Sequence, residues 1–350
     1  MRTPFWSDTT ARLYVGDACE VLAEMPAGSA DCIVTSPPYW GKRDYGVTGQ
    51  YGLEETPARY LAALQRVFRQ VHRVLAADGT CWINIGDSYA TGHKGSGGTT
   101  ASTLIGRPSP GIHFPVRAVQ PQLPAKNLLG LPWRLAWLLQ HDGWILRNAV
   151  VWHKPNAMPE SVRDRLSCRY ELIFLLVKQA RYWFDLDAIR EPLKRPDAAA
   201  DPPAVGGRRG AAGGAGASAR RRPGRPHGDA KYHHPAAPAF HRRRHGASML
   251  ATGRRHAAAH PGGKNPGDVW PVTTRPYRGA HFAVFPPGIP LRCIAAGCRP
   301  GGTVGDPFAG TATTGIAARQ LHRPFWGIEI SPSYARLAKD RLSPRQGGPR

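Results

Sequence analysis

Apolar residues along this chain gather in short runs that alternate with stretches of helical spacing. The run Ala30–Thr35 (ADCIVT) stops at two prolines, which predicts a buried strand that ends there. Pro57–Ala77 carries apolar residues three and four positions apart, with Pro in the first turn and Gly79 beyond the end, which predicts an amphipathic helix. We expect further strands at 12–16, 79–86, 144–152, 170–177, 303–305 and 324–330, and further helices at 18–24, 131–141, 290–297, 313–321 and 332–342. This alternation predicts an α/β domain with a mainly parallel sheet.

Two stretches interrupt the alternation. Residues 91–124 are rich in Gly, Ser, Thr and Pro, which predicts a long loop. Between Arg195 and His260, twelve Arg and one Lys against three Asp give a net charge of +10, and Val205 and Leu250 are the only Val, Ile or Leu residues. Such a segment buries too little apolar surface to offset the entropy lost on ordering, so we expect a mostly disordered insertion. A solvated linker, a flexible arm that binds DNA phosphates and a local frameshift in a GC-rich gene each fit this composition.

The whole chain of 350 residues is strongly basic, with 47 Lys and Arg against 24 Asp and Glu and a net charge of +23. Without the insertion the net charge is still +13, so the folded parts contribute to it. A charge of this size predicts a polyanionic partner, of which nucleic acid is the simplest. Hydrophobic residues make up 41% of the chain, which is enough for a sizeable core. We expect two parts of one domain at 1–190 and 266–350, with the insertion at 191–265.

Several classes of protein are disfavoured by what the sequence lacks. It has no run of about 18 apolar residues, which argues against a membrane-spanning helix. The first residues, MRTPFWSDTT, contain no apolar stretch of the kind found in secretory signals. The six cysteines are scattered without a C-x-x-C pair, which argues against a zinc site and against a disulfide scaffold. We therefore expect a cytoplasmic protein with no metal and no membrane partner.

A Gly-rich turn near the C-terminus joins a predicted strand to a predicted helix. Residues 301–315 read GGTVGDPFAGTATTG, and Glu329 ends the next strand, 23 positions after Asp306. Such a turn lets a ligand approach the backbone and the helix N-terminus. An acidic residue at the tip of the following strand can hold a ribose diol. Ala312 stands where the pattern G-x-G-x-x-G has its middle Gly, so an ordinary turn that needs small residues for packing is the alternative.

A second constellation follows the predicted strand at 30–35. Ser36-Pro37-Pro38-Tyr39 contains two prolines, which remove two N–H donors and leave nearby carbonyls and the Ser36 hydroxyl free to accept hydrogen bonds. The Tyr39 and Trp40 rings offer aromatic faces just beyond them. Ligands of open α/β sheets bind outside the carboxyl ends of strands, so the motif predicts a pocket for a flat base that bears an amino group. A Pro-Pro turn with aromatic rings packed in the core is the alternative.

The two constellations together resemble a known family. Thr35–Tyr39 (TSPPY) resembles the catalytic motif of the amino-group DNA methyltransferases, which act on cytosine N4 or adenine N6. Asp306–Gly310 (DPFAG), followed by Thr313–Gly315, resembles their S-adenosyl-L-methionine motif. The order of the two motifs resembles the permuted β class, whose target recognition region lies between them. The resemblance implies a Rossmann-like methyltransferase fold, circularly permuted, with a mostly parallel seven-stranded sheet and helices on both faces.

The resemblance also implies roles for individual residues. The Ser36 side chain and the Pro37 carbonyl would accept hydrogen bonds from the exocyclic amine and direct its lone pair at the cofactor's methyl group. Tyr39, which follows Pro38, would stack on the flipped base, and Glu329 would hold the cofactor's ribose. The cofactor-binding candidates are Asp306, Phe308, Gly310, Thr311, Thr313, Thr314, Glu329 and, more weakly, Asp17. For Asp17 a strand-end cap is an equal alternative, and Asp87, which follows another predicted strand, has even odds of facing the cleft.

The target that we expect is N4 of cytosine in double-stranded DNA. Ser before Pro-Pro-Tyr resembles the cytosine form of the motif, whereas Asp or Asn is commoner there in adenine enzymes. The Ser36 hydroxyl can donate to cytosine N3 as well as accept, although it could equally donate to adenine N1. An adenine N6 enzyme, a DNA-binding protein with impaired catalysis and a dinucleotide-dependent oxidoreductase are the alternatives. A cognate restriction endonuclease is a possible partner, and either a monomer or a homodimer is compatible with the sequence.

The Arg-rich insertion generates a prediction of its own. Replacing 195–260 by a short Gly/Ser bridge should leave the rest of the chain folded, and cofactor binding should be retained. DNA binding should then weaken less steeply with salt, because fewer phosphates are neutralised and fewer counterions are released. Circular dichroism and DNA titrations at several salt concentrations would measure both effects. A shortened protein that no longer folds would contradict the expectation.

Overall fold

The computed structural model describes residues 2–90, 123–193, 260, 262–274 and 285–343. Two compact units divide the chain: 1–190 together with 265–350 forms the first, and 191–264 forms the second. In the second unit, Glu191 and Lys264 pair through an antiparallel bridge. Residues 91–122 of the expected loop and most of the Arg-rich insertion lie outside the described residues.

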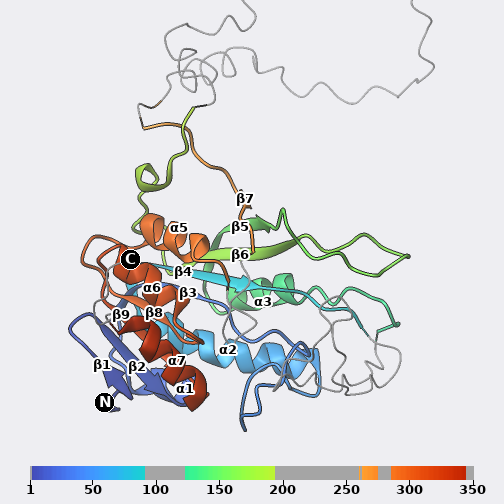
Figure 1. The fold of residues 1–350 in the computed structure, drawn as a ribbon, viewed down its shortest axis with the longest axis horizontal. Coiled ribbons are helices and arrows are strands. Elements are labelled where there is room, and N and C mark those ends of the chain that lie inside the picture. The colour runs from blue at the N-terminus through green and yellow to red at the C-terminus, as the bar shows by residue number, and fades with distance from the viewer. Residues whose placement is uncertain (1, 91–122, 194–259, 261, 275–284, 344–350) are drawn as a thin grey trace, which may run out of the picture. The chain divides into compact units, whose positions relative to one another are not determined.

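The first unit is built on a nine-stranded sheet with the strand order β1-β2-β9-β8-β3-β4-β6-β5-β7 (Figure 1). The strands are β1 (Trp6–Ser7), β2 (Ala11–Val15), β3 (Ala30–Thr35), β4 (Leu75–Ile85), β5 (Ile145–His153), β6 (Tyr170–Val177), β7 (Val269–Pro271), β8 (Val304–Asp306) and β9 (Phe325–Glu329). The run from β2 to β4 is parallel and so is the pair β5–β7, whereas β1 and β6 are antiparallel to their neighbours. The mostly parallel sheet is confirmed, but the expected number of seven strands is wrong. The two additional strands are the very short β1 and β7, which lie at the edges and carry too few residues to show a pattern.

Helices cover both faces of this sheet, as expected. They are α1 (Ala18–Glu24), α2 (Pro57–Val74), α3 (Leu131–His141), α5 (Gly288–Gly297), α6 (Thr313–Gln320) and α7 (Pro332–Leu342), and a short 3-10 helix spans Asp187–Ile189. One core cluster joins α1, α2 and α3 to the sheet, with Leu64 and Phe68 fully buried in it. The other joins α5, α6 and α7 to the opposite face, with Ile294 and Ala317 fully buried. Figure 1 shows α5, α6 and α7 next to one another in orange and red.

The boundary between α2 and β4 differs from the expectation. The helix was expected to run to Ala77, but it ends at Val74, and Leu75 already has extended backbone with φ −72° and ψ 138°. Leu75 is fully buried and pairs with Ala30 of β3, so it belongs to the sheet. An apolar residue at this position fits both the helical spacing and the start of a buried strand, and the pairing with β3 decides between them.

The topology brings several strand ends to one edge of the sheet. β3, β4, β8 and β9 are parallel, so their carboxyl ends lie along the same edge. β6 is antiparallel to β4 and β5, so its first residues lie at that edge as well. Both sequence constellations follow strands of this set. Within the described parts of the chain, no helix has the length and apolar character needed to cross a bilayer.

Candidate active site

A cavity of about 520 Å³ opens at this edge of the sheet. Residues from both predicted constellations line it, namely Ser36, Pro37, Pro38, Tyr39, Phe308, Gly310, Thr311, Thr313 and Glu329. Three candidates, Asp306, Thr314 and Asp17, are not among its lining residues. The fold therefore brings together two motifs that lie about 270 positions apart in the sequence.

Asp306 lies behind the cavity wall and connects the two motifs. Its carboxylate accepts hydrogen bonds from the hydroxyl of Thr35 at 2.6 Å and from the hydroxyl of Thr314 at 2.7 Å. It also accepts one from the backbone N–H of Phe308 at 3.0 Å. Burial raises the pKa of Asp306 to about 6, against the opposing effect of these donors. Asp306 and Thr314 thus hold the turn and the end of β3, which precedes Ser36, in register from behind.

The Gly-rich turn adopts left-handed backbone at two positions. Gly310 has φ 53°, and Ala312, the N-cap residue of α6, has φ 58° and ψ 42°. The Gly310 N–H donates to the Glu329 carboxylate at 2.9 Å, which ties the turn to the end of β9. Ala312 is fully buried and is not a lining residue of the cavity. Its methyl group therefore packs into the core and does not crowd a ligand.

Glu329 places a carboxylate at the cavity. Its second oxygen accepts the N–H of Ser331 at 2.8 Å. Burial raises the pKa of Glu329 to about 7, although the two N–H donors favour the charged form. A carboxylate oxygen accepts more than one hydrogen bond, so both oxygens retain lone pairs for hydroxyl groups of a ligand.

The two weaker candidates serve as caps. Asp17 accepts the N–H of Glu20 at 3.0 Å at the start of α1, and its other oxygen accepts the Tyr51 hydroxyl at 2.7 Å. Tyr51 lines the cavity, so Asp17 holds a lining residue without being one itself. Asp87 accepts the N–H of Leu131 at 3.1 Å at the start of α3 and does not line the cavity.

The Ser36–Tyr39 motif is held by contacts on several sides. Trp40, expected to offer a second aromatic face, is instead buried in the core, where its indole N–H donates to the Glu54 carbonyl at 2.8 Å. The Tyr60 hydroxyl from α2 donates to the Pro38 carbonyl at 2.9 Å. A Cβ on Gly86 would come within 2.7 Å of the Tyr39 ring, so this glycine is what allows the ring to lie against the backbone after β4. Among the described residues, none donates a hydrogen bond to the Pro37 carbonyl, so this acceptor is free at the cavity.

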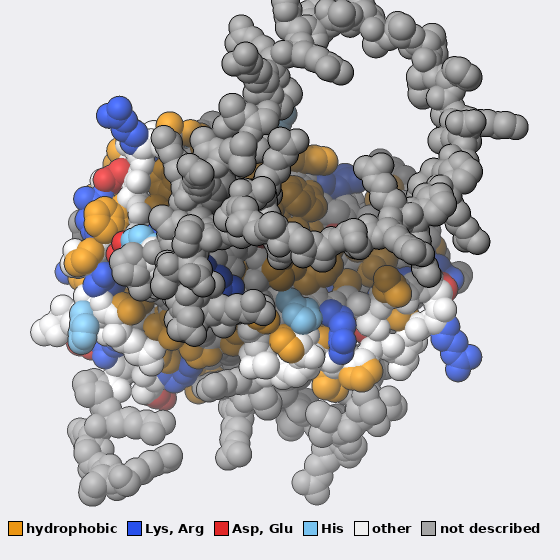
Figure 2. All heavy atoms as spheres, turned by 90° about the horizontal axis from the view of Figure 1, so that it is seen from above, with side chains coloured by type: hydrophobic (Ala, Val, Ile, Leu, Met, Phe, Trp, Pro, Cys, Tyr) orange, Lys and Arg blue, Asp and Glu red, His pale blue; other side chains and the backbone are white. Residues whose placement is uncertain are grey.

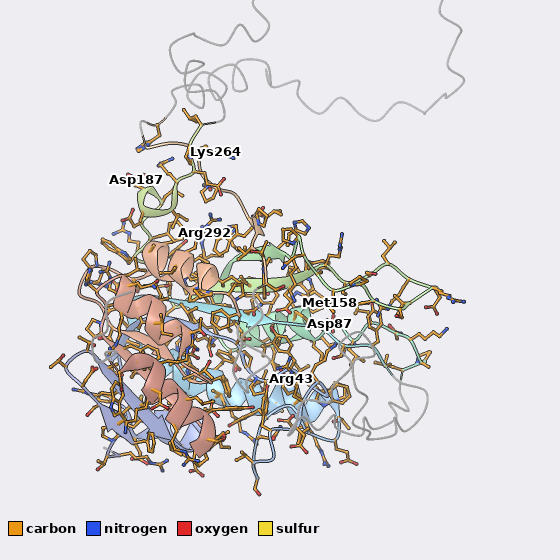
Figure 3. The ribbon with its side chains drawn as sticks, in the orientation of Figure 1. Arg43, Asp87, Met158, Asp187, Lys264 and Arg292 are labelled. Atoms are coloured by element: carbon orange, nitrogen blue, oxygen red, sulfur yellow. The ribbon has the colours of Figure 1, made fainter. Side chains whose placement is uncertain are left out.

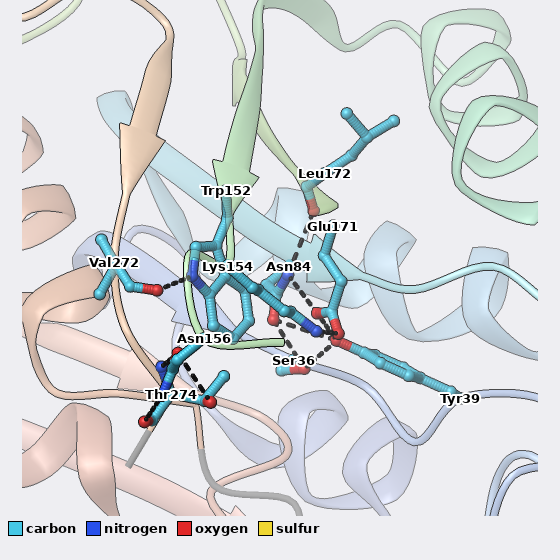
Figure 4. Close-up of polar contacts among 10 residues, drawn as sticks. All are labelled: Ser36, Tyr39, Asn84, Trp152, Lys154, Asn156, Glu171, Leu172, Val272 and Thr274. Carbon is cyan, nitrogen blue, oxygen red and sulfur yellow. Dashed lines mark hydrogen bonds and ion pairs between the residues drawn. The ribbon is translucent and has the colours of Figure 1, made fainter. Parts of the chain in front are cut away.

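A polar network extends from Tyr39 into β4, β5 and β6 (Figure 4). The Tyr39 hydroxyl donates to the Glu171 carboxylate at 2.6 Å and contacts the Asn84 side-chain oxygen at 3.0 Å. Glu171 forms an ion pair with Lys154, and the Lys154 ammonium lies 4.5 Å from the centre of the Trp152 ring. Burial and the neighbouring Glu171 charge raise the pKa of Tyr39 well above its usual value, so the phenol stays neutral.

Sequence reasoning did not assign a role to Asn84, Lys154 or Glu171. All three line the cavity. Each is a polar residue at the end or beginning of an apolar strand, and this was the available signal. That signal did not identify Glu171, because the direction of β6 decides at which edge of the sheet Glu171 lies. The sequence pattern of β6 does not reveal that direction.

Comparison with known proteins identifies the family. A family model described as DNA methylase, N6_N4_Mtase, matches residues 30–340. The type II methyltransferase M.XycI of Xanthomonas campestris pv. cyanopsidis is 38% identical, with 94% of this chain and 87% of that protein covered. M.SmaI of Serratia marcescens is also 38% identical, with 96% and 92% covered. This chain belongs to the N6/N4 DNA methylase family.

Two solved structures share the methylase fold. The PvuII DNA methyltransferase (cytosine-N4-specific) is 16% identical with a TM-score of 0.59, and the alignment covers 99% of this chain and 90% of that chain. A putative DNA modification methylase of Thermus thermophilus, TTHA0409, solved as a complex with S-adenosyl-L-methionine, is 22% identical with a TM-score of 0.52 and covers 95% and 93%. They confirm the Rossmann-like methyltransferase fold. Membership of the DNA methylase family also shows that the alternative of a dinucleotide-dependent oxidoreductase is wrong.

The surface of this methylase carries the positive charge noted in the sequence. On the face shown in Figure 2, Lys and Arg side chains (blue) are scattered among apolar ones, and few acidic side chains (red) are visible. Lys42 and Arg43 line the cavity itself. Arg43, labelled in Figure 3, lies in the loop that follows the Ser36–Tyr39 motif. Cations at the cavity favour an approaching phosphate backbone.

Ala312 allows a test of backbone strain in this family. Left-handed backbone costs a residue with a Cβ about 1–2 kcal/mol, which Ala312→Gly would remove. The same change loses a buried methyl group, about 0.8 kcal/mol, and adds unfolded-state entropy that costs about 0.4–1 kcal/mol. The effects nearly cancel, so thermal unfolding should show a change within about 1 kcal/mol. As the matched control, Gly310→Ala adds a Cβ at φ 53°, and the strain of about 1–2 kcal/mol less the unfolded-state entropy of about 0.4–1 kcal/mol leaves a net destabilisation of up to about 1.6 kcal/mol. A Gly310→Ala variant more stable than the wild type would contradict the strain argument.

Proposed function

We propose that this DNA methyltransferase methylates the exocyclic N4 of a flipped cytosine in double-stranded DNA, with S-adenosyl-L-methionine as the methyl donor. The observation that carries the proposal is the single cavity lined by both Ser36–Tyr39 and the Phe308–Gly310 turn with Glu329. A base and a cofactor bound in one cavity can react directly, and holding them in reactive geometry supplies much of the catalysis.

The cofactor side of the cavity has the chemistry that S-adenosyl-L-methionine requires. Glu329 offers a carboxylate for a ribose diol, and Gly310 leaves the backbone beside it uncovered. The rings of Tyr51 and Phe308 meet edge to face at 5.3 Å and provide an aromatic wall for a purine. When bound, the cofactor supplies a methyl group activated by a positively charged sulfur, so the chain's own residues need only orient and activate the amine.

The base side of the cavity supports binding of an amine. The Pro37 carbonyl and the Ser36 hydroxyl can accept the two N–H groups of an exocyclic amine, which favours a tetrahedral nitrogen with a directed lone pair. Ser36 Oγ lies 3.4 Å from the Tyr39 hydroxyl and 3.5 Å from the Asn84 oxygen. Both contacts are long, so Oγ can rotate toward a base at little cost.

The assignment to cytosine depends on Ser36. A hydroxyl can accept from the amine while its own proton points to Tyr39, or, after turning, donate that proton to the adjacent ring nitrogen, N3 of cytosine. A carboxylate at this position could donate only when protonated. N6 of adenine remains the alternative within the family, because adenine presents the same pair of groups.

Two further expectations extend from the family to this chain. The relatives M.XycI and M.SmaI are type II methyltransferases, which supports a cognate restriction endonuclease as a partner. We expect the protein to be either a monomer or a homodimer.

Glu329 gives a pH-dependent prediction. With a pKa of about 7, this carboxyl is partly protonated at neutral pH. The affinity for S-adenosyl-L-methionine should rise between about pH 6 and pH 8, because the ionised form accepts both ribose hydroxyls.

Glu329→Ala should lose about 1.5–3 kcal/mol of binding per hydrogen bond, which is a tenfold or greater loss of affinity. Calorimetry would measure the affinity of the wild type, Glu329→Ala and Glu329→Gln for S-adenosyl-L-methionine at each pH. The Gln variant should bind weakly with no such pH dependence. An affinity unchanged from the wild type would refute the role of Glu329 in holding the ribose.

Ser36 gives a prediction for the chemistry and its product. Ser36→Ala should lower the turnover number by about tenfold or more and leave cofactor affinity nearly unchanged, because it removes one contact to the amine. Ser7→Ala, at an exposed position of β1, is the control and should behave as the wild type.

The product of the wild-type enzyme gives a separate test. Nuclease digestion of methylated DNA followed by mass spectrometry should yield N4-methylcytosine. N6-methyladenine as the sole product would overturn the target base and keep the enzyme class.

A further inference from the structure

A continuous line of hydrogen bonds leads from the catalytic motif to a carboxylate. Ser36 Oγ donates to the Tyr39 hydroxyl at 3.4 Å, and the Tyr39 hydroxyl donates to Glu171 Oε2 at 2.6 Å. The other oxygen of Glu171 is paired with the Lys154 ammonium. All of these residues line the cavity, and Figure 4 shows them converging from the loop after β3, the end of β5 and the start of β6.

We propose that Glu171 takes up the proton that the target amine releases, through the Ser36 and Tyr39 hydroxyls. This inference rests on the proposed function, because it assigns the fate of the proton in that reaction. The roles proposed for binding the base and the cofactor do not involve Glu171. They therefore do not explain why its carboxylate accepts a hydrogen bond from the Tyr39 hydroxyl.

The cavity offers few other acceptors for a proton. Among its described lining residues, the carboxylates are Glu171 and Glu329, and none is a histidine. Glu329 is bound to the Gly310 turn on the cofactor side. Glu171 is instead in direct contact with the catalytic motif, and its side chain is only 15% exposed. A largely buried carboxylate two hydroxyls away from the reacting nitrogen is well placed for general base catalysis.

The relay balances atoms and charge. The amine nitrogen forms a bond to the methyl carbon while the carbon–sulfur bond breaks, and that electron pair stays on sulfur. As positive charge develops on the nitrogen, its proton passes to Ser36 Oγ. The Ser36 proton passes to the Tyr39 oxygen, and the Tyr39 proton passes to Glu171. Both hydroxyls are regenerated, Glu171 becomes a neutral acid, and its proton is later lost to water.

The neighbours of the relay suit this role. The Tyr39 phenol is kept neutral, so it retains a proton to pass on. Asn84 donates to Glu171 Oε2 at 3.1 Å and to the Leu172 carbonyl at 3.2 Å, which orients both the carboxylate and the Tyr39 hydroxyl. Its amide does not exchange protons readily, so Asn84 is a positioning residue. Lys154 offsets the negative charge of the largely buried carboxylate.

Glu171→Gln and Tyr39→Phe break the relay with little change in shape. The Gln side chain keeps an oxygen that can accept from Tyr39, and the Phe ring keeps the stacking face. Single-turnover transfer of a radiolabelled methyl group to DNA carrying the recognised site should slow by about 100-fold or more in each variant. Cofactor affinity by calorimetry, and base flipping by fluorescence of 2-aminopurine at the target position, should match the wild type. Glu24→Gln is the matched control and should transfer at the wild-type rate, because Glu24 is the last residue of α1 and pairs with Arg2 away from the cavity lining.

A wild-type transfer rate in Glu171→Gln would overturn the relay. Slow transfer with lost base flipping would also overturn it, because Glu171 would then only position Tyr39. If Glu171→Gln does not fold, Tyr39→Phe decides in the same way, since it removes a single hydroxyl. Failure of the proposed function is distinguishable in the unmodified protein, which would then transfer no methyl group to DNA or give N6-methyladenine as its sole product.

Discussion

The buried carboxylate of Asp306 is the constraint on which the rest of the site depends. It is 1% exposed and joins Thr35, at the end of β3, to Thr314 on α6 and to the backbone of Phe308. Neighbouring β3 and β8 already place these segments side by side. The hydrogen bonds to one carboxylate then fix the spacing between the turn and the residue that precedes Ser36. Direct transfer between two bound molecules requires such a fixed spacing, since errors of about 1 Å are costly.

The antiparallel strand β6 supplies what the parallel strands do not. In a purely parallel sheet, every functional group at the carboxyl edge would come from the end of a strand. Because β6 runs the other way, its first residues, including Glu171, lie at that edge beside Lys154 from the end of β5. The pair of charges is therefore brought against Tyr39 by topology, and neither charge is close to it in the sequence. A carboxylate and an ammonium in contact limit the cost of burying either one alone.

Much of the fold was predictable because its elements are strongly patterned. The strand at 30–35 and the helix that begins at Pro57 follow from apolar spacing, proline and capping signals. The motifs predicted the cavity because strand ends in α/β sheets converge on one edge. The roles of Asp17 and Asp87 as helix caps were not resolved in advance, since an acidic residue after a strand can face either a ligand or a backbone N–H. The Glu171 network was not foreseen, because it depends on strand order and direction.

The raised pKa values of Asp306 and Glu329 show that this site is built at a cost in stability. An acid whose pKa is higher in the folded state holds its proton more tightly there than in the unfolded state. The free energy of unfolding is therefore highest at a pH below the unfolded-state pKa, and it falls as the pH rises toward the folded-state pKa. The pKa rises from 3.8 to about 6 for Asp306 and from 4.5 to about 7 for Glu329. Each rise lowers the free energy of unfolding at neutral pH by roughly 3 kcal/mol. A chain selected for stability alone would replace such groups by apolar ones. Asp306 begins the Gly-rich turn and Glu329 holds that turn from the end of β9. Their presence is explained by what they hold: Asp306 the strand end before Ser36, and Glu329 the side of the cavity proposed for the cofactor.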